Sequence, residues 1–177
     1  MTTPSPAAAP ATLRELRPGD LGWVISRHGQ LYAEEYGWDM RFESLLARIA
    51  ADYLDRLDAT SECAWVAEVD GRPAGCAFLV KARNDSTGLV DPGVAQLRML
   101  LVEPWARGCG VGKLLNAESA RFARAAGYRR MRLWTNSLLL AARGIYQAAG
   151  YRLLASEAHH SFGHALVGEV WEKDLEH

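Results

Sequence analysis

Apolar side chains recur every three or four residues in two segments near the start of the chain, and this spacing predicts two amphipathic helices. The first helix carries Leu21, Val24, Ile25, His28, Leu31 and Tyr32. The second carries Phe42, Leu45, Leu46, Ile49, Tyr53, Leu54 and Leu57. The segment YGWD separates the two helices, and a short strand around Leu13 and Leu16 precedes them. We therefore expect a strand and two helices at the start of the fold.

Strand-like runs and two further helices follow, divided by turn residues. CAWVAEVDGRPAGCAFLV at 63–80 predicts a hairpin, because Gly71 in its turn can adopt positive φ. VAQLRMLLVEP predicts a strand that ends at Pro104, which has no amide hydrogen for a sheet hydrogen bond. Helical spacing begins at Gly110 and is followed by the strand RRMRLWT, the helix LLLAARGIYQAAG and the closing strands YRLLAS and LVGEVWEKDL. The predicted element order is βααβββαβαββ.

The length and composition of the chain indicate one domain. Of its 177 residues, 49% are hydrophobic, which is enough to bury one core, and we expect the domain to span residues 11–174. Residues 1–10, MTTPSPAAAP, have no apolar stretch and predict a disordered tail rather than a signal peptide. LEH at 175–177 matches the start of a vector-encoded histidine tag and is a possible tag remnant.

Charge and cysteine usage exclude several classes of protein. Twenty basic and twenty-one acidic residues give a net charge of -1 without a dense Lys/Arg stripe, so we expect no nucleic-acid partner. No apolar run is long enough to span a bilayer, and we expect no membrane partner. Cys63, Cys76 and Cys109 form no paired or metal-ligand spacing, which predicts a reduced, cytoplasmic protein with no metal.

The segment EPWARGCGVGKLLNAE places Gly108, Gly110 and Gly112 between a predicted strand and a predicted helix. A Walker A loop would need glycine at Arg107 and a hydroxyl at Leu114, so that interpretation fails. The GxGxG spacing and the preceding strands also disfavour a dinucleotide fingerprint. Glycines at a helix start allow close approach of an anion to the amides, and a pyrophosphate would suit the site. A tight turn that needs glycine only for its geometry is the alternative.

The loop and the element order together resemble the GNAT superfamily of acyl-CoA-dependent N-acyltransferases. The pyrophosphate loop of that family is Gln/Arg-x-x-Gly-x-Gly/Ala, entered from a strand of the form LLVEP. AARGIYQAAGYRLL at 141–154 adds the family's later signature in Ala142, Tyr146, Gly150 and Tyr151. The resemblance covers about residues 11–174. It implies an α/β fold of the α+β type, with a central mixed, mostly antiparallel twisted sheet flanked by helices.

Three segments are more narrowly similar to the acetyltransferase half of bacterial proteins that fuse a MarR-type DNA-binding domain to a GNAT domain. They are RHGQLYAEEYGW, LWTNSLLLAARGIY and HHSFGHALVGEVWEKDL. We expect no DNA-binding half in this chain, and no regulatory role is carried over.

The resemblance implies acetyl-CoA as co-substrate and assigns residues to it. Backbone groups of Leu100, Leu101 and Val102 would pair with the pantetheine arm, as an added strand does. The loop that would hold the pyrophosphate comprises Arg107, Gly108, Cys109, Gly110, Val111, Gly112 and Lys113. Tyr146 matches the tyrosine expected to protonate the leaving thiolate. The cofactor-contacting asparagine of many members is replaced by Leu138 or Leu139, and Asn136 is the candidate substitute.

The acceptor side is less well defined by the sequence. A familiar catalytic carboxylate of the family falls near Gln96, which cannot act as a base, so the general base stays open. The acidic and aromatic segment YAEEYGWD offers Tyr32, Glu35 and Trp38 for a cationic amine. Alternatively, the acidic residues of this segment simply form the solvated end of a helix. His160, beside His159 in a predicted loop, could supply a base, or both could be plain surface residues.

These observations predict an N-acetyltransferase that moves an acetyl group from acetyl-CoA to a primary amine of a small molecule in a ternary complex. A non-catalytic acyl-CoA sensor is the alternative from another class, motivated by the missing carboxylate and asparagine. A protein N-terminal acetyltransferase is the alternative within the enzymes. A homodimer is expected only by analogy with the family.

Overall fold

The computed structural model describes residues 10–176, so most of the expected tail at 1–10 and the last residue of the possible tag lie outside it. The elements are β1 (Thr12–Glu15), α1 (Asp20–Tyr36), α2 (Arg41–Arg56), β2 (Cys63–Val69), β3 (Arg72–Arg83), β4 (Val90–Val102), the 3₁₀ turn η1 (Pro104–Ala106), α3 (Val111–Ala125), β5 (Arg130–Asn136), α4 (Leu140–Ala148), β6 (Arg152–Ser161) and β7 (His164–Asp174). This order confirms the predicted βααβββαβαββ.

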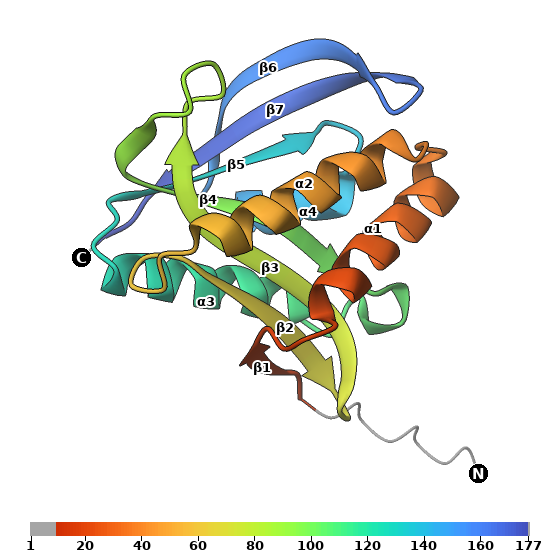
Figure 1. Cartoon of the computed structure of the whole chain (residues 1–177), viewed down its shortest axis with the longest axis horizontal. Helices are drawn as coiled ribbons and strands as arrows, with labels where there is room; N and C mark the ends of the chain where they lie inside the picture. The colour runs from red at the N-terminus through yellow and green to blue at the C-terminus, as the bar shows by residue number, and fades with distance from the viewer. Residues whose placement is uncertain (1–9, 177) are drawn as a thin grey trace.

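A single mixed sheet forms the middle layer of the fold (Figure 1). Its seven strands run in the order β1-β2-β3-β4-β5-β7-β6. Only β4 and β5 are parallel, and every other neighbouring pair is antiparallel. Helices α1 and α2 cover one face of the sheet, and α3 and α4 cover the other. The expected α+β architecture is therefore confirmed.

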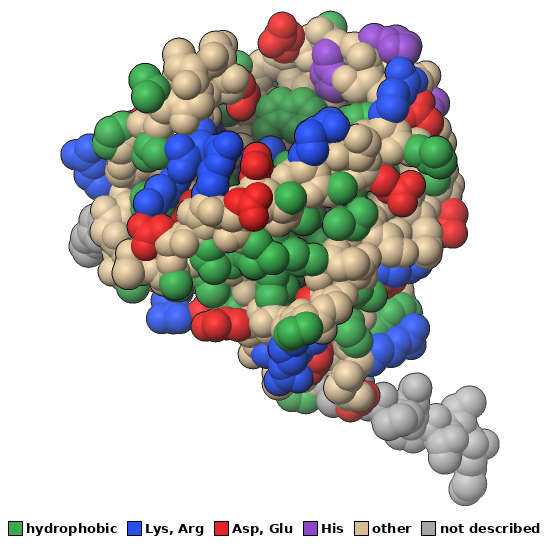
Figure 2. All heavy atoms as spheres, viewed as in Figure 1, with side chains coloured by type: hydrophobic (Ala, Val, Ile, Leu, Met, Phe, Trp, Pro, Cys, Tyr) green, Lys and Arg blue, Asp and Glu red, His purple; other side chains and the backbone are tan. Residues whose placement is uncertain are grey.

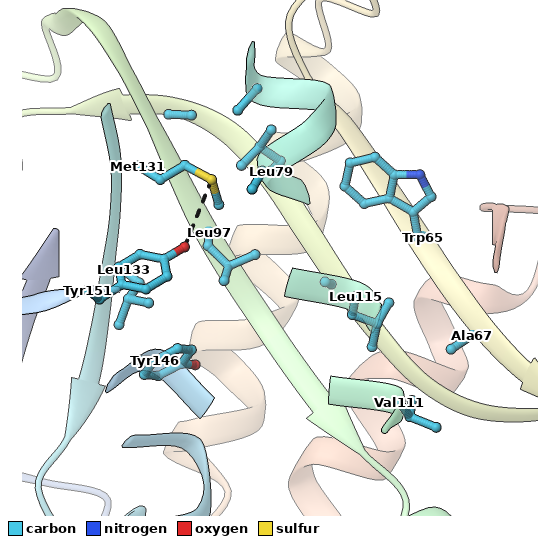
Figure 3. Packing of buried hydrophobic residues seen from close by; sticks show 14 of the residues in the cluster. Trp65, Ala67, Leu79, Leu97, Val111, Leu115, Met131, Leu133, Tyr146 and Tyr151 are labelled. Atoms are coloured by element: carbon cyan, nitrogen blue, oxygen red, sulfur yellow. Dashed lines mark hydrogen bonds between the residues drawn. The ribbon is translucent and has the colours of Figure 1, made fainter. Parts of the chain in front are cut away.

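Buried side chains on both faces hold the layers together. On the face covered by α3 and α4, the largest cluster includes Leu115, Met131, Leu133, Tyr146 and Tyr151 (Figure 3). The Tyr151 hydroxyl donates to Asn116 Oδ1 at 3.1 Å and lies 3.9 Å from Met131 Sδ, so the polar end of this buried ring is satisfied. Burial on this face fixes α4, and with it Tyr146, against β5.

The parallel strands β4 and β5 stay paired for only part of their length. Their register runs from Val94 opposite Arg130 to Leu97 opposite Leu133 and then stops. Just beyond it, Met99 has φ 53°, and the pairing of β4 with β3 is shifted there by a bulge. The last residues of β4 continue along β3 while β5 departs, which opens the sheet at this point.

Gly75 on β3 permits the close contact that holds the end of β4. A Cβ atom added to Gly75 would lie 2.5 Å from the backbone oxygen of Leu101. We expect Gly75→Ala to lower the free energy of unfolding by about 1–3 kcal/mol, because backbone has to move to relieve the overlap. Gly22→Ala, on α1 with no atom within 4 Å of the added Cβ, is the control and is expected to be neutral or stabilising. Equal urea midpoints for the two variants would contradict the prediction.

The end of the chain differs from the sequence prediction in the length of β6. β6 extends to Ser161, so His159 and His160 belong to a strand and the predicted loop is wrong. The sequence missed this extension because β6 is an edge strand, exposed along nearly its whole length, and it shows no alternation of apolar residues. Leu175 is buried in the main cluster and its amide donates to Arg129 O at 2.8 Å.

Candidate active site

Two cavities meet where β4 and β5 separate. The smaller, which we call the groove, has a volume of about 380 Å³ and runs between α1, the end of β4 and the starts of α3 and α4. The larger, which we call the inner cavity, has a volume of about 540 Å³ and lies between α2, the middle of β4 and β5. Tyr32, Leu100, Leu139 and Ala142 line both, so the two cavities adjoin each other at these residues.

The view in Figure 2 looks onto the α1 and α2 side of the molecule. A hollow opens there between α2 and the strands β5 to β7, with hydrophobic side chains on its floor. Lys and Arg side chains gather along one side of this hollow, with a few acidic side chains among them. The surface around the inner cavity is therefore more basic than the overall charge of the chain indicates.

The groove ends at the start of α3, where unpaired amides face it. Gly110 precedes the helix with φ 80°, a conformation that favours glycine. Within the described residues, no backbone carbonyl accepts a hydrogen bond from the amides of Gly110, Val111, Gly112 or Lys113. These amides and the helix dipole attract negative charge, and the groove can therefore hold an anion such as a pyrophosphate.

An ion pair crosses the mouth of the groove. Arg107 Nη2 lies 2.6 Å from Glu35 Oε1, which ties the glycine loop to the last turn of α1. Both side chains are partly exposed, so the pair adds little to stability. Glu35 was expected among the residues that receive the amine, but it lines the groove and its charge is compensated there.

Most residues expected to contact the cofactor are brought together in the groove. Its lining includes Leu100, Leu101, Val102, Arg107, Gly108, Gly110, Val111, Gly112 and Lys113. Cys109 is exposed and does not line it. Asn136 lies in the inner cavity instead, where His159 Nε2 donates to its Oδ1 at 2.9 Å. The glycine loop and the end of β4 thus form one surface, and Asn136 belongs to the acceptor side.

Tyr146 lines the inner cavity from α4 and is only 5% exposed. Its ring centroid lies 5.7 Å from that of Tyr151, in an edge-on arrangement that fixes its orientation. Burial raises the pKa of the Tyr146 hydroxyl, because the phenolate would lose its hydration. The hydroxyl is therefore protonated at neutral pH and can act as a proton donor.

The remaining walls of the inner cavity are aromatic. Tyr32 and Trp38 line it as expected, and their ring centroids are 5.0 Å apart. Phe162, at the turn between β6 and β7, packs against Trp38, so the β6–β7 hairpin supports this aromatic wall. His160 is exposed and lines neither cavity, so the expected histidine is absent from the acceptor side.

Two residues of the inner cavity were not expected on the acceptor side from the sequence. His28, on the apolar face of α1, is 2% exposed, and its Nδ1 lies 2.8 Å from Val24 O. Because a carbonyl only accepts, Nδ1 carries the hydrogen and Nε2 keeps a lone pair. Burial lowers the pKa of His28 to about 4, so the ring is neutral at physiological pH. Arg98 on β4 is the second residue, and the only signal for either was a polar side chain within an apolar pattern.

Comparison with known protein families identifies this arrangement. The model of the Acetyltransferase (GNAT) family matches residues 26–151, which span the groove and Tyr146. The chain belongs to the GNAT acetyltransferase family. Among curated GNAT relatives, N-acetyltransferase family 8 member 3 of Mus musculus is 30% identical over 68% of this chain and 53% of its own length. N-acetylaspartate synthetase of Danio rerio is 28% identical over 64% of this chain and 37% of its own length.

The fold itself is that of solved GNAT structures. A phosphinothricin acetyltransferase from Sinorhizobium meliloti, solved in complex with acetyl-CoA, aligns with a TM-score of 0.73 and 22% identity, over 93% of this chain and 88% of that one. The chain spans only about a third to a half of the length of the two curated relatives. No helix among residues 10–176 is both long and apolar enough to cross a membrane.

Two features distinguish the site of this GNAT domain. Gln96 lines the inner cavity at the place where the resemblance implies a carboxylate. Leu139 lines both the groove and the cavity at one of the positions where many members carry asparagine. Neither side chain can accept a proton from an amine, so any base in this site has to come from elsewhere.

Proposed function

We propose that this GNAT domain transfers the acetyl group of acetyl-CoA to the primary amine of a small molecule. The observation that carries the proposal is the pair of adjoining cavities, one lined by the α3 start with its free amides and the other by the buried Tyr146. Acetyl-CoA would occupy the groove, with its pyrophosphate at Gly110 to Lys113 and its pantetheine arm along Leu100 to Val102. Its thioester would then lie where the groove meets the inner cavity.

The proposed reaction is a direct transfer in a ternary complex. The amine nitrogen attacks the thioester carbonyl carbon, a C–N bond forms and the C–S bond breaks. The Tyr146 hydroxyl donates a proton to the leaving thiolate, and the amine loses one proton in the same reaction, so the overall products are the amide and free CoA. The neutral His28 ring offers an acceptor lone pair on the amine side of the cavity.

A small acceptor is favoured over a protein by the β6–β7 hairpin, which packs against the aromatic wall of the inner cavity. The β6–β7 hairpin is docked onto the turn between α1 and α2, where Asp39 N donates to Phe162 O at 3.2 Å and His164 Nε2 lies 2.9 Å from Gly37 O. An extended peptide would have to displace these contacts. The names of the similar proteins N-acetylaspartate synthetase and phosphinothricin acetyltransferase also refer to small molecules.

Two measurements test the proposal. Titration calorimetry with acetyl-CoA is expected to give saturable binding at one site per chain, and a panel of primary amines is expected to release CoA thiol. Binding without turnover of any amine or peptide would favour the acyl-CoA sensor. Turnover of peptides alone would favour a protein N-terminal acetyltransferase. Absence of acetyl-CoA binding would overturn the proposal at its first step.

Other expectations from the sequence stay predictions. These are the cytoplasmic location, the homodimer, the absence of a nucleic-acid or membrane partner, the absence of a metal and the similarity to MarR–GNAT fusion proteins. The exposed β6 edge is where a second copy could add to the sheet, and the mass of the purified protein in solution tests the dimer.

A further inference from the structure

The charged side chains around the inner cavity are unevenly paired. Arg132 contacts Asp91 at 3.0 Å and Glu172 at 2.9 Å, so its charge is compensated. The acids expected to attract a cation are compensated as well, because Glu35 pairs with Arg107 and Asp39 pairs with Arg41. Among residues 10–176, Arg98 has no acidic partner within ion-pair distance. Arg83 and Asp85, where β3 ends, also line the cavity without an ion pair among the described residues, so its unpaired charges include both signs, and Arg98 is the one on β4.

The position of Arg98 directs it toward the acceptor rather than toward solvent. It lies opposite Phe78 in the antiparallel pair β3–β4, and cross-strand partners point to the same face of a sheet. Phe78 packs with Val24 and Tyr53 under α1 and α2. Arg98 thus faces the space between the sheet and these helices, one residue before the bulge that opens the sheet.

Partial burial makes the unpaired guanidinium of Arg98 unfavourable for the stability of the fold. Loss of hydration lowers the pKa of Arg98, and the more distant charges of Asp85 and Asp52 only partly offset that effect. A guanidinium presents several N–H donors and no acceptor, so its needs are met only by an acceptor group or by water. Arg98 is partly buried, and a partly desolvated charge without a partner is unfavourable for stability, which favours a functional reason for its presence.

A second donor in the same cavity is also unsatisfied. Trp38 is 4% exposed, lines the inner cavity, and its buried indole Nε1 has no hydrogen-bond partner among the described residues. Trp171 gives the contrast, because its Nε1 donates to Glu169 Oε2 at 2.9 Å. Arg143 Nε also lacks a well-oriented hydrogen bond but lies 3.1 Å from Glu169 Oε2, so its charge is compensated. The inner cavity is thus lined both by Arg98, which has no ion-pair partner, and by Trp38, whose buried indole N–H has no acceptor.

We propose that the acceptor amine carries a carboxylate, which Arg98 binds. This inference rests on the proposed acetyl transfer and names the class of its substrate. A planar carboxylate accepts paired hydrogen bonds from a guanidinium, which is the strongest geometry available to Arg98. The apolar residues Phe42, Leu45 and Ile49 of α2 line the rest of the cavity and suit an apolar side chain on the same molecule. An amino acid with an apolar side chain fits these features.

The test compares matched acceptors. Leucine and phenylalanine are offered beside their carboxamides and their decarboxylated amines, and release of CoA thiol is measured at saturating acetyl-CoA. We expect kcat/KM for the acids to exceed that for the amides and amines by more than about tenfold, because only the acids neutralise Arg98. Equal kcat/KM values across each set would overturn the carboxylate site while leaving acetyl transfer intact.

Variants of Arg98 separate recognition from folding. Arg98→Gln is expected to abolish the preference for the acids, and Arg98→Lys to retain part of it, since a lysine keeps the charge without the planar fork. Arg121→Gln on the exposed surface of α3 is the matched control and should keep the preference. We expect Arg98→Gln to have an equal or higher melting temperature than the unchanged protein, because an unpaired, partly buried charge is removed. A lower melting temperature with unchanged preference would assign Arg98 a purely structural role.

Binding of amino acids can be measured separately from their acetylation, so the carboxylate site and the acetyl transfer can fail independently. If no amine is turned over, calorimetry with leucine and phenylalanine in the presence of CoA is the deciding experiment. If the protein binds these amino acids and Arg98→Gln does not, the carboxylate site is supported while the proposed enzyme activity is rejected. No binding of any acid and no turnover would overturn both.

Discussion

Tyr146→Phe is expected to lower kcat by about a hundredfold or more and to leave the affinity for acetyl-CoA nearly unchanged. The reason is the position of the side chain. Tyr146 lines the inner cavity and not the groove, so its hydroxyl is available to the reacting sulfur but contributes little to cofactor binding. Burial raises its pKa and keeps the proton in place until the thiolate forms. Initial rates of thiol release and calorimetry with acetyl-CoA measure the two quantities separately.

Tyr128→Phe is the matched control for the loss of a buried tyrosine hydroxyl. Tyr128 is 7% exposed, and its hydroxyl donates to Ser61 O at 2.9 Å, away from both cavities. This variant is expected to lose about 1 kcal/mol of stability and to keep full turnover. An unchanged kcat in Tyr146→Phe, or an equal loss in both variants, would remove Tyr146 as the acid.

The element order could be predicted from the sequence because most helices and strands bury one face, and their apolar residues then recur with the spacing of a helix or a strand. The stripe from Phe42 to Tyr53 and the turn at Gly71 are local patterns that need no knowledge of distant residues. The edge strand β6 lacks such a pattern, because pairing with β7 alone holds it and both its faces meet solvent. Its histidines were therefore expected in a loop, and the outward position of His160 could not be foreseen.

The cofactor side of the site was predictable for a similar reason. A glycine with positive φ at a helix start, Gly110, and the strand residues just before it are close in the sequence, and local geometry brings them together. The acceptor side is assembled from segments far apart in the chain. Glu35 meets Arg107 across 72 positions, and no local pattern reveals that this pair cancels the expected acidic character.

The same limit explains why the lack of an acidic partner for Arg98 could not be predicted. Strand alternation can predict which residues of β4 share a face, but the absence of an acidic partner depends on α1, α2 and β5 together. If Arg98 binds a carboxylate, the electrostatics of the acceptor side differ from the acidic collar expected from the sequence. A collar of free acids would attract a cationic amine, whereas the compensated acids and the uncompensated Arg98 favour a molecule that also carries negative charge.

Acidification from about pH 7 to about pH 4 is expected to destabilise the fold through His28 by on the order of 3 kcal/mol. In the native state, burial lowers the pKa of His28 from 6.5 to about 4. Between these two values the unfolded chain binds a proton that the native state excludes, so the free energy of unfolding falls as the pH falls. Below about pH 4 both states are protonated and this contribution no longer changes.

The contribution of His28 is isolated by comparing variants over the same pH range. His28→Gln keeps a donor for Val24 O but has no proton to gain, so urea unfolding of this variant should lose most of the pH dependence between about pH 6.5 and pH 4. His160→Gln, on the exposed β6 strand, is the control and should retain the dependence of the unchanged protein. Carboxylates that titrate in this range act equally in all three proteins and cancel in the comparison. Parallel curves for His28→Gln and the unchanged protein would show that the buried ring is not the group responsible.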